Sequence, residues 1–299
     1  MQAIDHLAAA MMRHTPGDGI HPTPLPRLKL TRAANPTLPI PAVYDPGICI
    51  VAQGAKTAQA GARQFRYDPA HYLLASVDLP LIGRVVEASP DKPYLCVWLD
   101  FDVAAIADLL VAHPDGAPRG SVPPGLMIDR ATPALLDAAA RLVGLLDQPD
   151  DVPVLAPLVE RELVWRLLAT PAGPMLRHMA LADGRLARIG EAIRWLRAHF
   201  DEAVAVDQLA DRAGMSPSAF HHQFKALTLM SPLQYRTRLR LEAARRLMAT
   251  EGLDAATAGF RVGYGSPSQF SRDYVRAFGI PPARDAAQLR EAGPYPVAA

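Results

Sequence analysis

The sequence predicts an α+β protein, with a small antiparallel β-barrel and flanking helices in the N-terminal half and an all-α C-terminal domain. Three observations predict this class. Short apolar segments, separated by turn residues, fill residues 47–102. Helical patterns follow at 133–147 and 156–169. A repeated helix-turn-helix pattern lies in the last third of the chain. With 299 residues, the chain is long enough for two domains.

The composition bounds the class of protein. Half of the residues are apolar, so a large core is expected, but no apolar run approaches the roughly 18 residues that a membrane span needs. The N-terminus lacks the pattern of a secretory signal. Cys49 and Cys96 lie far apart and form no metal motif. We therefore expect a cytoplasmic protein with reduced thiols, no cofactor and no membrane partner.

The N-terminal half divides into an arm, strands and helices. The many prolines of residues 20–45 predict an extended arm. The segments 47–54, 56–80, 81–90 and 94–102 are punctuated by Gly-Ala, Asp-Pro and Ser-Pro-Asp, which suits a small antiparallel barrel. The helix predicted at 133–147 carries an apolar stripe of Leu135, Leu136, Ala139, Leu142, Val143 and Leu146. The stripe fits either packing on the barrel or dimerisation, and both remain open.

A helix-turn-helix pattern covers residues 209–227. Ser216 is a good N-cap and Pro217 suits the first helical position. Phe220, Phe224 and Leu227 share one face of the predicted helix. The other face holds Ser218, His221, His222 and Lys225. A short helix ends at Gly214 just before, so this second helix would present its polar face to a groove.

The pattern occurs twice. SPSAFHHQFKAL (216–227) returns as SPSQFSRDYVRAF (266–278), with the aromatic positions kept and the exposed ones changed. A helix predicted at 231–248, about 27 Å long, could hold two such helices about 34 Å apart, one duplex turn. Residues 185–290 contain 16 Lys and Arg against 10 Asp and Glu, a net charge of +6. This basic domain fits a nucleic-acid surface.

Residues 185–290 resemble the DNA-binding domain of the AraC/XylS family of transcription regulators. The resemblance rests on AVDQLADRAGMSPSAFHHQFKALTLMSPLQYRTRLRLEAARRLM and GFRVGYGSPSQFSRDYVRAFGIPP. It implies double-stranded promoter or operator DNA as partner. The implied base-reading residues are Ser218, His221, His222, Ser268, Gln269 and Arg272. Arg272 suits guanine and Gln269 suits adenine, whereas Lys225 and Arg276 are better placed for phosphates.

Several of these residues have a structural alternative. Gln269 is also the N3 residue of a capping box that starts at Ser266, where it would bond the backbone instead. Arg240 is expected to tie the two subdomains together. His221 and His222 cannot share one metal ion, because adjacent helical side chains point about 100° apart. The chain also departs from the family after the double proline, where PPARDAA replaces an aromatic-Arg pair.

The N-terminal half resembles the N-terminal domain of one AraC subfamily, through YDPGICIVAQGAK, YDPAHYLLASVDLPLIGRVVEASPDKPYLCVWLD and VLAPLVERELVWRLLATPAGPMLRHMALADGRLARI. This implies a cupin-like barrel over 21–182, after an N-terminal segment 1–20, that binds an unknown small-molecule effector and pairs subunits in a homodimer. Candidates for the pocket are Cys49, His71, Tyr72 and Trp98. Cys49 is either a small buried hydrophobe or a reactive thiol that senses electrophiles, which would need a lowered pKa.

The leading hypothesis is a sequence-specific regulator that responds to an effector and reads two successive major-groove segments. One alternative is a cupin-type metalloenzyme, but the histidines of this half (His6, His14, His21, His71, His113 and His178) are scattered, so we expect no catalytic and no metal site. Another is a regulator without an effector. An activator would also contact RNA polymerase, and the sequence carries no residue signature for that surface.

Overall fold

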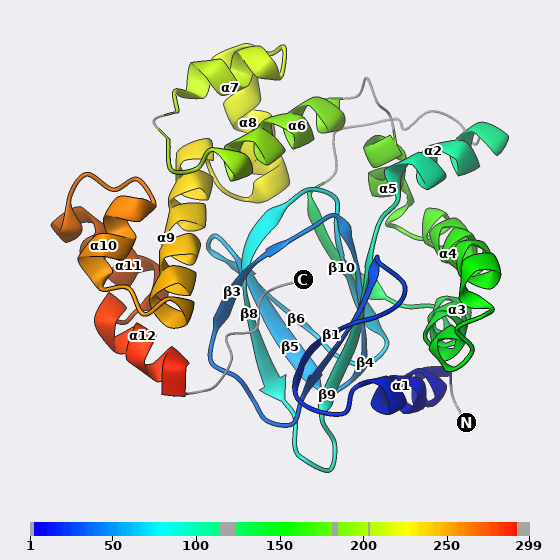
Figure 1. The fold of residues 1–299 in the computed structure, drawn as a ribbon. Helices are drawn as coiled ribbons and strands as arrows, with labels where there is room; N and C mark the ends of the chain where they lie inside the picture. The colour runs from blue at the N-terminus through cyan, green and yellow to red at the C-terminus, as the bar shows by residue number, and fades with distance from the viewer. Residues whose placement is uncertain (1–2, 114–123, 181–184, 203, 292–299) are drawn as a thin grey trace. The chain divides into compact units, whose positions relative to one another are not determined.

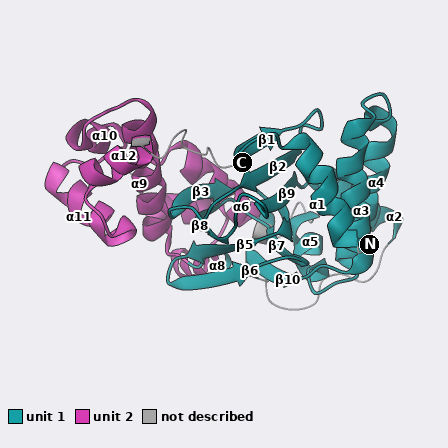
Figure 2. Cartoon of the chain, turned by 90° about the horizontal axis from the view of Figure 1, so that it is seen from below, with its two compact units in different colours: residues 1–187, 226–229, 298–299 teal, residues 188–225, 230–297 magenta. Residues whose placement is uncertain are grey.

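The computed structural model describes residues 3–113, 124–180, 185–202 and 204–291. The chain forms two compact units, coloured separately in Figure 2. Unit 1 comprises residues 1–187, 226–229 and 298–299, and unit 2 comprises 188–225 and 230–297. Each unit is described by itself below. No helix among the described residues combines the length and the apolar character needed to cross a membrane.

Unit 1 is built on two antiparallel sheets (Figure 1). The six-stranded sheet has the order β1-β2-β9-β4-β7-β10. Its strands are β1 (Gly19–Pro22), β2 (Leu28–Ala33), β9 (Tyr94–Asp100), β4 (Gly47–Gln53), β7 (His71–Ala75) and β10 (Leu126–Arg130). The four-stranded sheet has the order β3-β8-β5-β6, from β3 (Ile40–Tyr44), β8 (Leu79–Glu87), β5 (Ala55–Ala60) and β6 (Arg63–Tyr67). The predicted strands at 47–54, 81–90 and 94–102 are confirmed.

The strand register decides which side chains enter the space between the sheets. Cys49 on β4 pairs with Trp98 on β9, so their side chains point to the same face. The ring of Trp98 meets that of Tyr44 on β3 edge-on, with centroids 5.3 Å apart, so this face is turned toward the second sheet. The two sheets therefore face each other and enclose the barrel core, and the predicted α+β class is confirmed.

The proline-rich region does not form the extended arm that the composition predicted. Residues 19–22, 28–33 and 40–44 within or beside it are strands of the two sheets. Leu28 and Leu30 of this region are fully buried. The prolines lie mostly between strands or on β1 and β3, which end their sheets, where a missing N–H costs no ladder bond.

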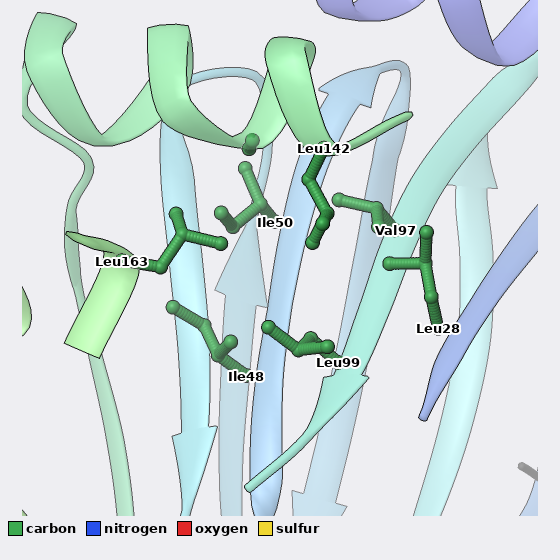
Figure 3. Close-up of a pocket in the computed structure, with 8 residues that line it drawn as sticks. Leu28, Ile48, Ile50, Val97, Leu99, Leu142 and Leu163 are labelled. Carbon is green, nitrogen blue, oxygen red and sulfur yellow. The ribbon is translucent and has the colours of Figure 1, made fainter. Parts of the chain in front are cut away.

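Helices α1 (Ala3–His14), α3 (Pro133–Gly144) and α4 (Val152–Leu168) cover the outward face of the six-stranded sheet. The short 3₁₀ turn η1 (Leu145–Asp147) follows α3, and α2 (Val103–Ala112) and α5 (Gly173–Ala180) pack against each other and against α4. Figure 3 shows Leu142 of α3 and Leu163 of α4 directed at Ile48 and Ile50 of β4. The apolar stripe of α3 is buried, from Leu135 to Val143, so packing on its own domain is the outcome for this stripe.

Unit 2 is helical throughout its described residues. Its helices are α6 (Arg185–Ala198), α7 (Val206–Arg212), α8 (Pro217–Thr228), α9 (Pro232–Thr250), α10 (Ala255–Arg261), α11 (Pro267–Phe278) and α12 (Pro282–Glu291). The long helix α9 begins with a complete capping box between Ser231 and Gln234. The two predicted helix-turn-helix units are thus α7–α8 and α10–α11, and the helix predicted to join them is α9.

The joining helix is anchored at both subdomains. The guanidinium of Arg240 donates to the carbonyls of Phe200 (2.6 Å), Asp201 (2.9 Å) and Gly263 (2.9 Å). Gly263 has φ +88° and no room for a Cβ, which would lie 2.2 Å from the Asp201 carbonyl oxygen. The prediction that Arg240 ties the subdomains is confirmed by these bonds, which join the turn before α11 to the end of α6.

Candidate nucleic-acid interface and effector site

The first helix-turn-helix owes its shape to a glycine turn and an aromatic cluster. Gly214, with φ +61°, ends the segment after α7 in the left-handed region that favours glycine. Phe220 and Phe224 are fully buried, and Phe224 meets Tyr235 of α9 edge-on at 5.4 Å. This packing fixes the rotation of α8 about its own axis. Its opposite face therefore carries exposed side chains, namely Ser218, His221, His222 and Lys225.

The second helix-turn-helix, α10–α11, is built in the same way but exposes different side chains. Phe270 and Tyr274 of α11 are fully buried. Ser268, Gln269 and Arg272 are exposed on the helix they belong to. The side chain of Ser266 makes no cap bond to the helix, so the capping box that would have used Gln269 is not formed. The amide of Gln269 is therefore not held by this backbone contact.

Two cations flank these faces. Lys225 of α8 is exposed. Arg276 of α11 has a side chain that is 80% exposed and pairs with Asp273 at 3.3 Å. Such an exposed pair contributes little to stability, so its guanidinium can exchange partners at small cost. The predicted residues of α8 thus lie on one exposed face of that helix, and those of α11 lie on one exposed face of theirs. Contact with a major groove requires such a face.

The end of the chain explains the departure at PPARDAA. Asp285 of α12 is almost fully buried and accepts bonds from Arg245 Nε (2.6 Å), Arg245 Nη2 (2.9 Å) and the Tyr274 hydroxyl (2.7 Å). Arg245 also stacks over the ring of Phe278, 4.9 Å from its centroid. Asp285 therefore holds α12 against α9 and α11, and this position serves the domain's own packing.

The barrel interior holds a second group of candidates. Cys96 pairs with Val51 in register, and Cys49 pairs with Trp98, so the two thiols project into the same space. Thr31 on β2 lies directly opposite Cys96. From the second sheet, Lys56 extends over the ring of Tyr44, 5.4 Å from its centroid. Polar groups of both sheets therefore meet inside the barrel.

Two tyrosines complete this cluster. The hydroxyls of Tyr67 and Tyr94 are buried, and among the described residues neither makes a hydrogen bond of ordinary geometry. Tyr67 interacts with Tyr44, and Tyr94 interacts with the two cysteines. A buried hydroxyl without a partner carries a desolvation cost. A ligand with polar atoms inside the barrel would remove that cost, which makes this cluster, with Lys56, Cys49 and Cys96, the candidate effector site.

The two thiols differ in acidity. The hydrogen bond from Cys49 lowers the pKa of Cys96 to about 6, with further help from the ammonium of Lys56 and against the effect of burial. The same hydrogen bond raises the pKa of Cys49 well above its ordinary value. Burial acts to lower the pKa of Lys56, but Tyr44 and the two cysteines outweigh it, and its pKa lies above the usual range. The lowered pKa that a reactive Cys49 would need is found at Cys96.

The other predicted pocket residues lie apart. Tyr72 pairs with Ile50, so it belongs to the helix-covered face of the sheet, and its hydroxyl contacts Thr170 at 3.2 Å. His71 is partly buried at the start of β7 and its Nδ1 bonds to Asp68 at 2.6 Å. Neither joins the thiol cluster, whereas Cys49 and Trp98 do.

Sequence reasoning missed Cys96, Lys56, Tyr44, Tyr67 and Tyr94. Part of the signal was present, since alternation along YLCVWLD places Tyr94, Cys96 and Trp98 on one face of a strand. The contribution of the second sheet needed the strand order. Among the described residues, no three His, Cys, Asp or Glu side chains are grouped in a way that would hold a metal ion.

Comparison with known proteins identifies the family of this chain. Residues 24–175, half of its length, match the model of the AraC-type transcriptional regulator N-terminus. The chain belongs to the AraC family of transcriptional regulators. Residues 209–288 also match the model of a helix-turn-helix domain. The family resemblance predicted from the sequence is confirmed.

The chain is also similar in sequence to known regulators and in fold to solved structures. The chain is 30% identical over 166 residues to the HTH-type transcriptional activator RhaS of Salmonella schwarzengrund, which covers 54% of this chain and 58% of RhaS. The alignment thus spans little more than half of the length of that AraC-family relative. The fold is similar to that of ToxT from Vibrio cholerae with bound unsaturated fatty acid, with a TM-score of 0.56 and 9% identity over 87% of this chain and 93% of ToxT. A ToxT structure with a naphthalenyl butenoic acid gives a TM-score of 0.55 at 9% identity, covering 87% of this chain and 99% of that one.

Proposed function

We propose that this AraC-family chain is a sequence-specific, DNA-binding transcription regulator that reads two successive major-groove segments with α8 and α11. The observation that carries the proposal is the exposed polar face that each helix presents opposite its buried aromatic residues, Phe220 and Phe224 in one and Phe270 and Tyr274 in the other. We also propose a cytoplasmic location, because that is where the DNA target would lie.

The exposed faces of α8 and α11 carry different side chains, so the two helix-turn-helix motifs read different bases. On α11, Arg272 offers a bidentate donor pair for guanine, and Gln269, free of the capping box, offers the donor and acceptor that match adenine. On α8, His221 and His222 can donate to or accept from base edges when neutral. Lys225 and Arg276 neutralise phosphates and set the register of the protein on the duplex.

We further propose that an effector binds inside the barrel of unit 1. The buried hydroxyls of Tyr67 and Tyr94, which make no hydrogen bond of ordinary geometry among the described residues, support this position, as does Lys56, which pairs with Tyr67 in the sheet. ToxT, which shares the fold, has been crystallised with a fatty acid. An effector can shift the equilibrium between two conformations of the regulator only by as much as its affinity for those two conformations differs. Of the residues predicted from the sequence, Cys49 and Trp98 line this space.

Unit 1 also offers a surface for a homodimer. Val154, Leu158 and Trp165 of α4 are 67%, 61% and 46% exposed and lie on one side of the helix. An exposed apolar stripe of this kind is costly in water and favours a second copy with the same stripe, as in a two-fold dimer. Sedimentation velocity of Leu158→Glu should then show monomer where the unaltered chain shows dimer. Leu38→Glu, at an exposed leucine outside the stripe, is the control.

Selection of bound DNA from a random pool, with the full chain at fixed salt, tests the DNA-reading proposal. Two enriched blocks about 10 base pairs apart are expected. The double variant His221→Ala/His222→Ala should lose one block, and Gln269→Ala/Arg272→Ala should lose the other, so that each variant is the control for its counterpart. Equal enrichment by both variants and the unaltered chain would remove these residues from base reading. A single enriched block would mean that one helix-turn-helix contacts only the phosphate backbone of the DNA.

A further inference from the structure

The only two cysteines of this 299-residue chain lie next to each other in the folded barrel. They are 47 positions apart in the sequence, yet β4 and β9 are adjacent strands, and both side chains point to the inner face. Cys49 is 2% exposed and Cys96 is 4% exposed. The thiol of Cys49 hydrogen-bonds to Cys96. This pairing is unrelated to the exposed faces of α8 and α11.

The surroundings give the two thiols different roles. Lys56 from β5 and Thr31 from β2 act on Cys96 and stabilise its thiolate. Cys49, which donates to Cys96, stays protonated. An acidic thiol beside a protonated one is the arrangement in which the first reacts with an oxidant and the second completes a disulfide. The titratable groups that face this pair are Lys56, Tyr44, Tyr67 and Tyr94.

We propose that Cys96 and Cys49 form a reversible oxidation site for small hydroperoxides, in which Cys96 is oxidised first and Cys49 converts the product to an intrachain disulfide. In the first step, the Cys96 thiolate attacks the O–O bond. One oxygen stays on sulfur as a sulfenic acid, and the other leaves as water or an alcohol after taking up a proton. In the second step, Cys49 displaces water from that sulfur and the S–S bond forms. Both electrons of the hydroperoxide reduction come from the two thiols.

Closing this bond requires a movement of the strands. Cys49 and Cys96 are diagonal neighbours, because Cys49 pairs with Trp98 and Cys96 pairs with Val51. Diagonal Cα atoms lie about 7–8 Å apart in a sheet, whereas a disulfide usually needs about 4.4–6.8 Å. The two Cα atoms must therefore come about 1–2 Å closer through a local slide and twist of β4 against β9, because the strands already lie at hydrogen-bonding distance. The register shift in the β4–β9 ladder between Val51 and Gln53 lies beside the pair and can absorb this change.

The movement would change how α3 and α4 pack on the other face of the six-stranded sheet. The neighbours of the cysteines along the strands, Ile48, Ile50 and Val97, line a small apolar gap under α3 and α4 (Figure 3). The gap has room for about 10 Å³ and is closed on the helix side by Ala139, Leu142 and Leu163. A sub-ångström to ångström shift of β4 and β9 can repack this gap, so oxidation inside the barrel would reach its outer helices.

Peptide mapping of the full chain after hydrogen peroxide tests the proposal. The expected product is an intrachain cross-link between the peptides that hold Cys49 and Cys96, with both thiols lost and then recovered with a reductant. In Cys49→Ser, Cys96 should stop at a sulfenic acid that dimedone traps. In Cys96→Ser, Cys49 should not react at the same dose. A far-UV spectrum and a melting curve establish whether each variant is folded, and the mapping of the unaltered chain stands even if one is not.

Lys56→Gln separates a specific site from nonspecific oxidation. If Lys56 helps to hold the Cys96 thiolate, the rate of thiol loss at pH 7 should fall several-fold, with about 30-fold as the ceiling if Cys96 returned to an ordinary thiol. The difference should vanish near pH 10, where the thiol ionises in both proteins. If both thiols still react with a thiol reagent after the chain has been treated with peroxide and then unfolded, the proposal is wrong. A disulfide between chains, or a sulfenic acid found first on Cys49, would also overturn it.

Discussion

The buried pair of Arg245 and Asp285 gives the sharpest test of how the second helix-turn-helix is held. Asp285→Ala removes a carboxylate that is 2% exposed and accepts two bonds from Arg245, at 2.6 and 2.9 Å, and one from the Tyr274 hydroxyl at 2.7 Å. Arg245 is itself 3% exposed, so its charge would lose its nearest counter-ion in a site that water does not reach. Removal of one partner of such a pair costs about 3–5 kcal/mol.

This cost can be read locally in the full chain by hydrogen exchange of peptides from α9, α11 and α12. A loss of 3–5 kcal/mol raises the opening constant, and with it the exchange rate, from about 100-fold to a few thousand-fold. Peptides of unit 1 are the internal control and should not change. Tyr274→Phe is the matched variant, since it removes one hydroxyl bond to the same carboxylate and should cost only about 0.5–1.5 kcal/mol.

Two results would refute this reasoning. Unchanged protection of α12 in Asp285→Ala would mean that water or another carboxylate compensates Arg245. Glu242 is the nearest candidate, because its charge interacts with Arg245 and burial raises its pKa above the usual value. A loss in Tyr274→Phe as large as that in Asp285→Ala would show that the hydroxyl, and not the ion pair, holds α12.

Four further outcomes are expected. Arg272→Ala should weaken binding to the selected DNA by about 1–3 kcal/mol and relax preference at one base pair; equal weakening on all sequences would make Arg272 a phosphate contact. Lys225→Ala should flatten the plot of log affinity against log salt by about one unit, and an unchanged slope would exclude a phosphate contact. Phe224→Ala should cost unit 2 about 3–5 kcal/mol through a core cavity, measured by urea unfolding, and unaltered unfolding would contradict its packing against Tyr235. Oxidation of Cys96 should slow as the pH falls below about 6, because its lowered pKa leaves less thiolate there, and a rate independent of pH between 5 and 8 would contradict this.

Short-range patterns in the sequence predicted most of unit 2. The spacing of Phe220 and Phe224 defined the buried face of α8, and the exposed positions followed from the same helical period. The start of α9 was visible as Ser231 and Pro232, and the structure adds the full capping box. Gln269 was ambiguous, because a capping box and a free side chain share the same sequence.

In unit 1 the sequence located strands and helices but not their partners. It misread residues 20–45 as an arm, because proline density is a local signal and does not show that the segments between prolines pair with β9 and β8. It also selected Tyr72 together with Cys49, although these lie on opposite faces of the six-stranded sheet.

By itself, the sequence determined the helix-turn-helix repeat, the family, and which helical faces are buried, because helix periods, caps and turns depend on residues a few positions apart. Only the tertiary structure decided that Cys49 meets Cys96, that Lys56 joins them from the second sheet, and that Asp285 binds Arg245. The physical reason is that strand order and buried ion pairs join residues roughly 40 or more positions apart, and their partners are chosen by register and packing across the whole domain.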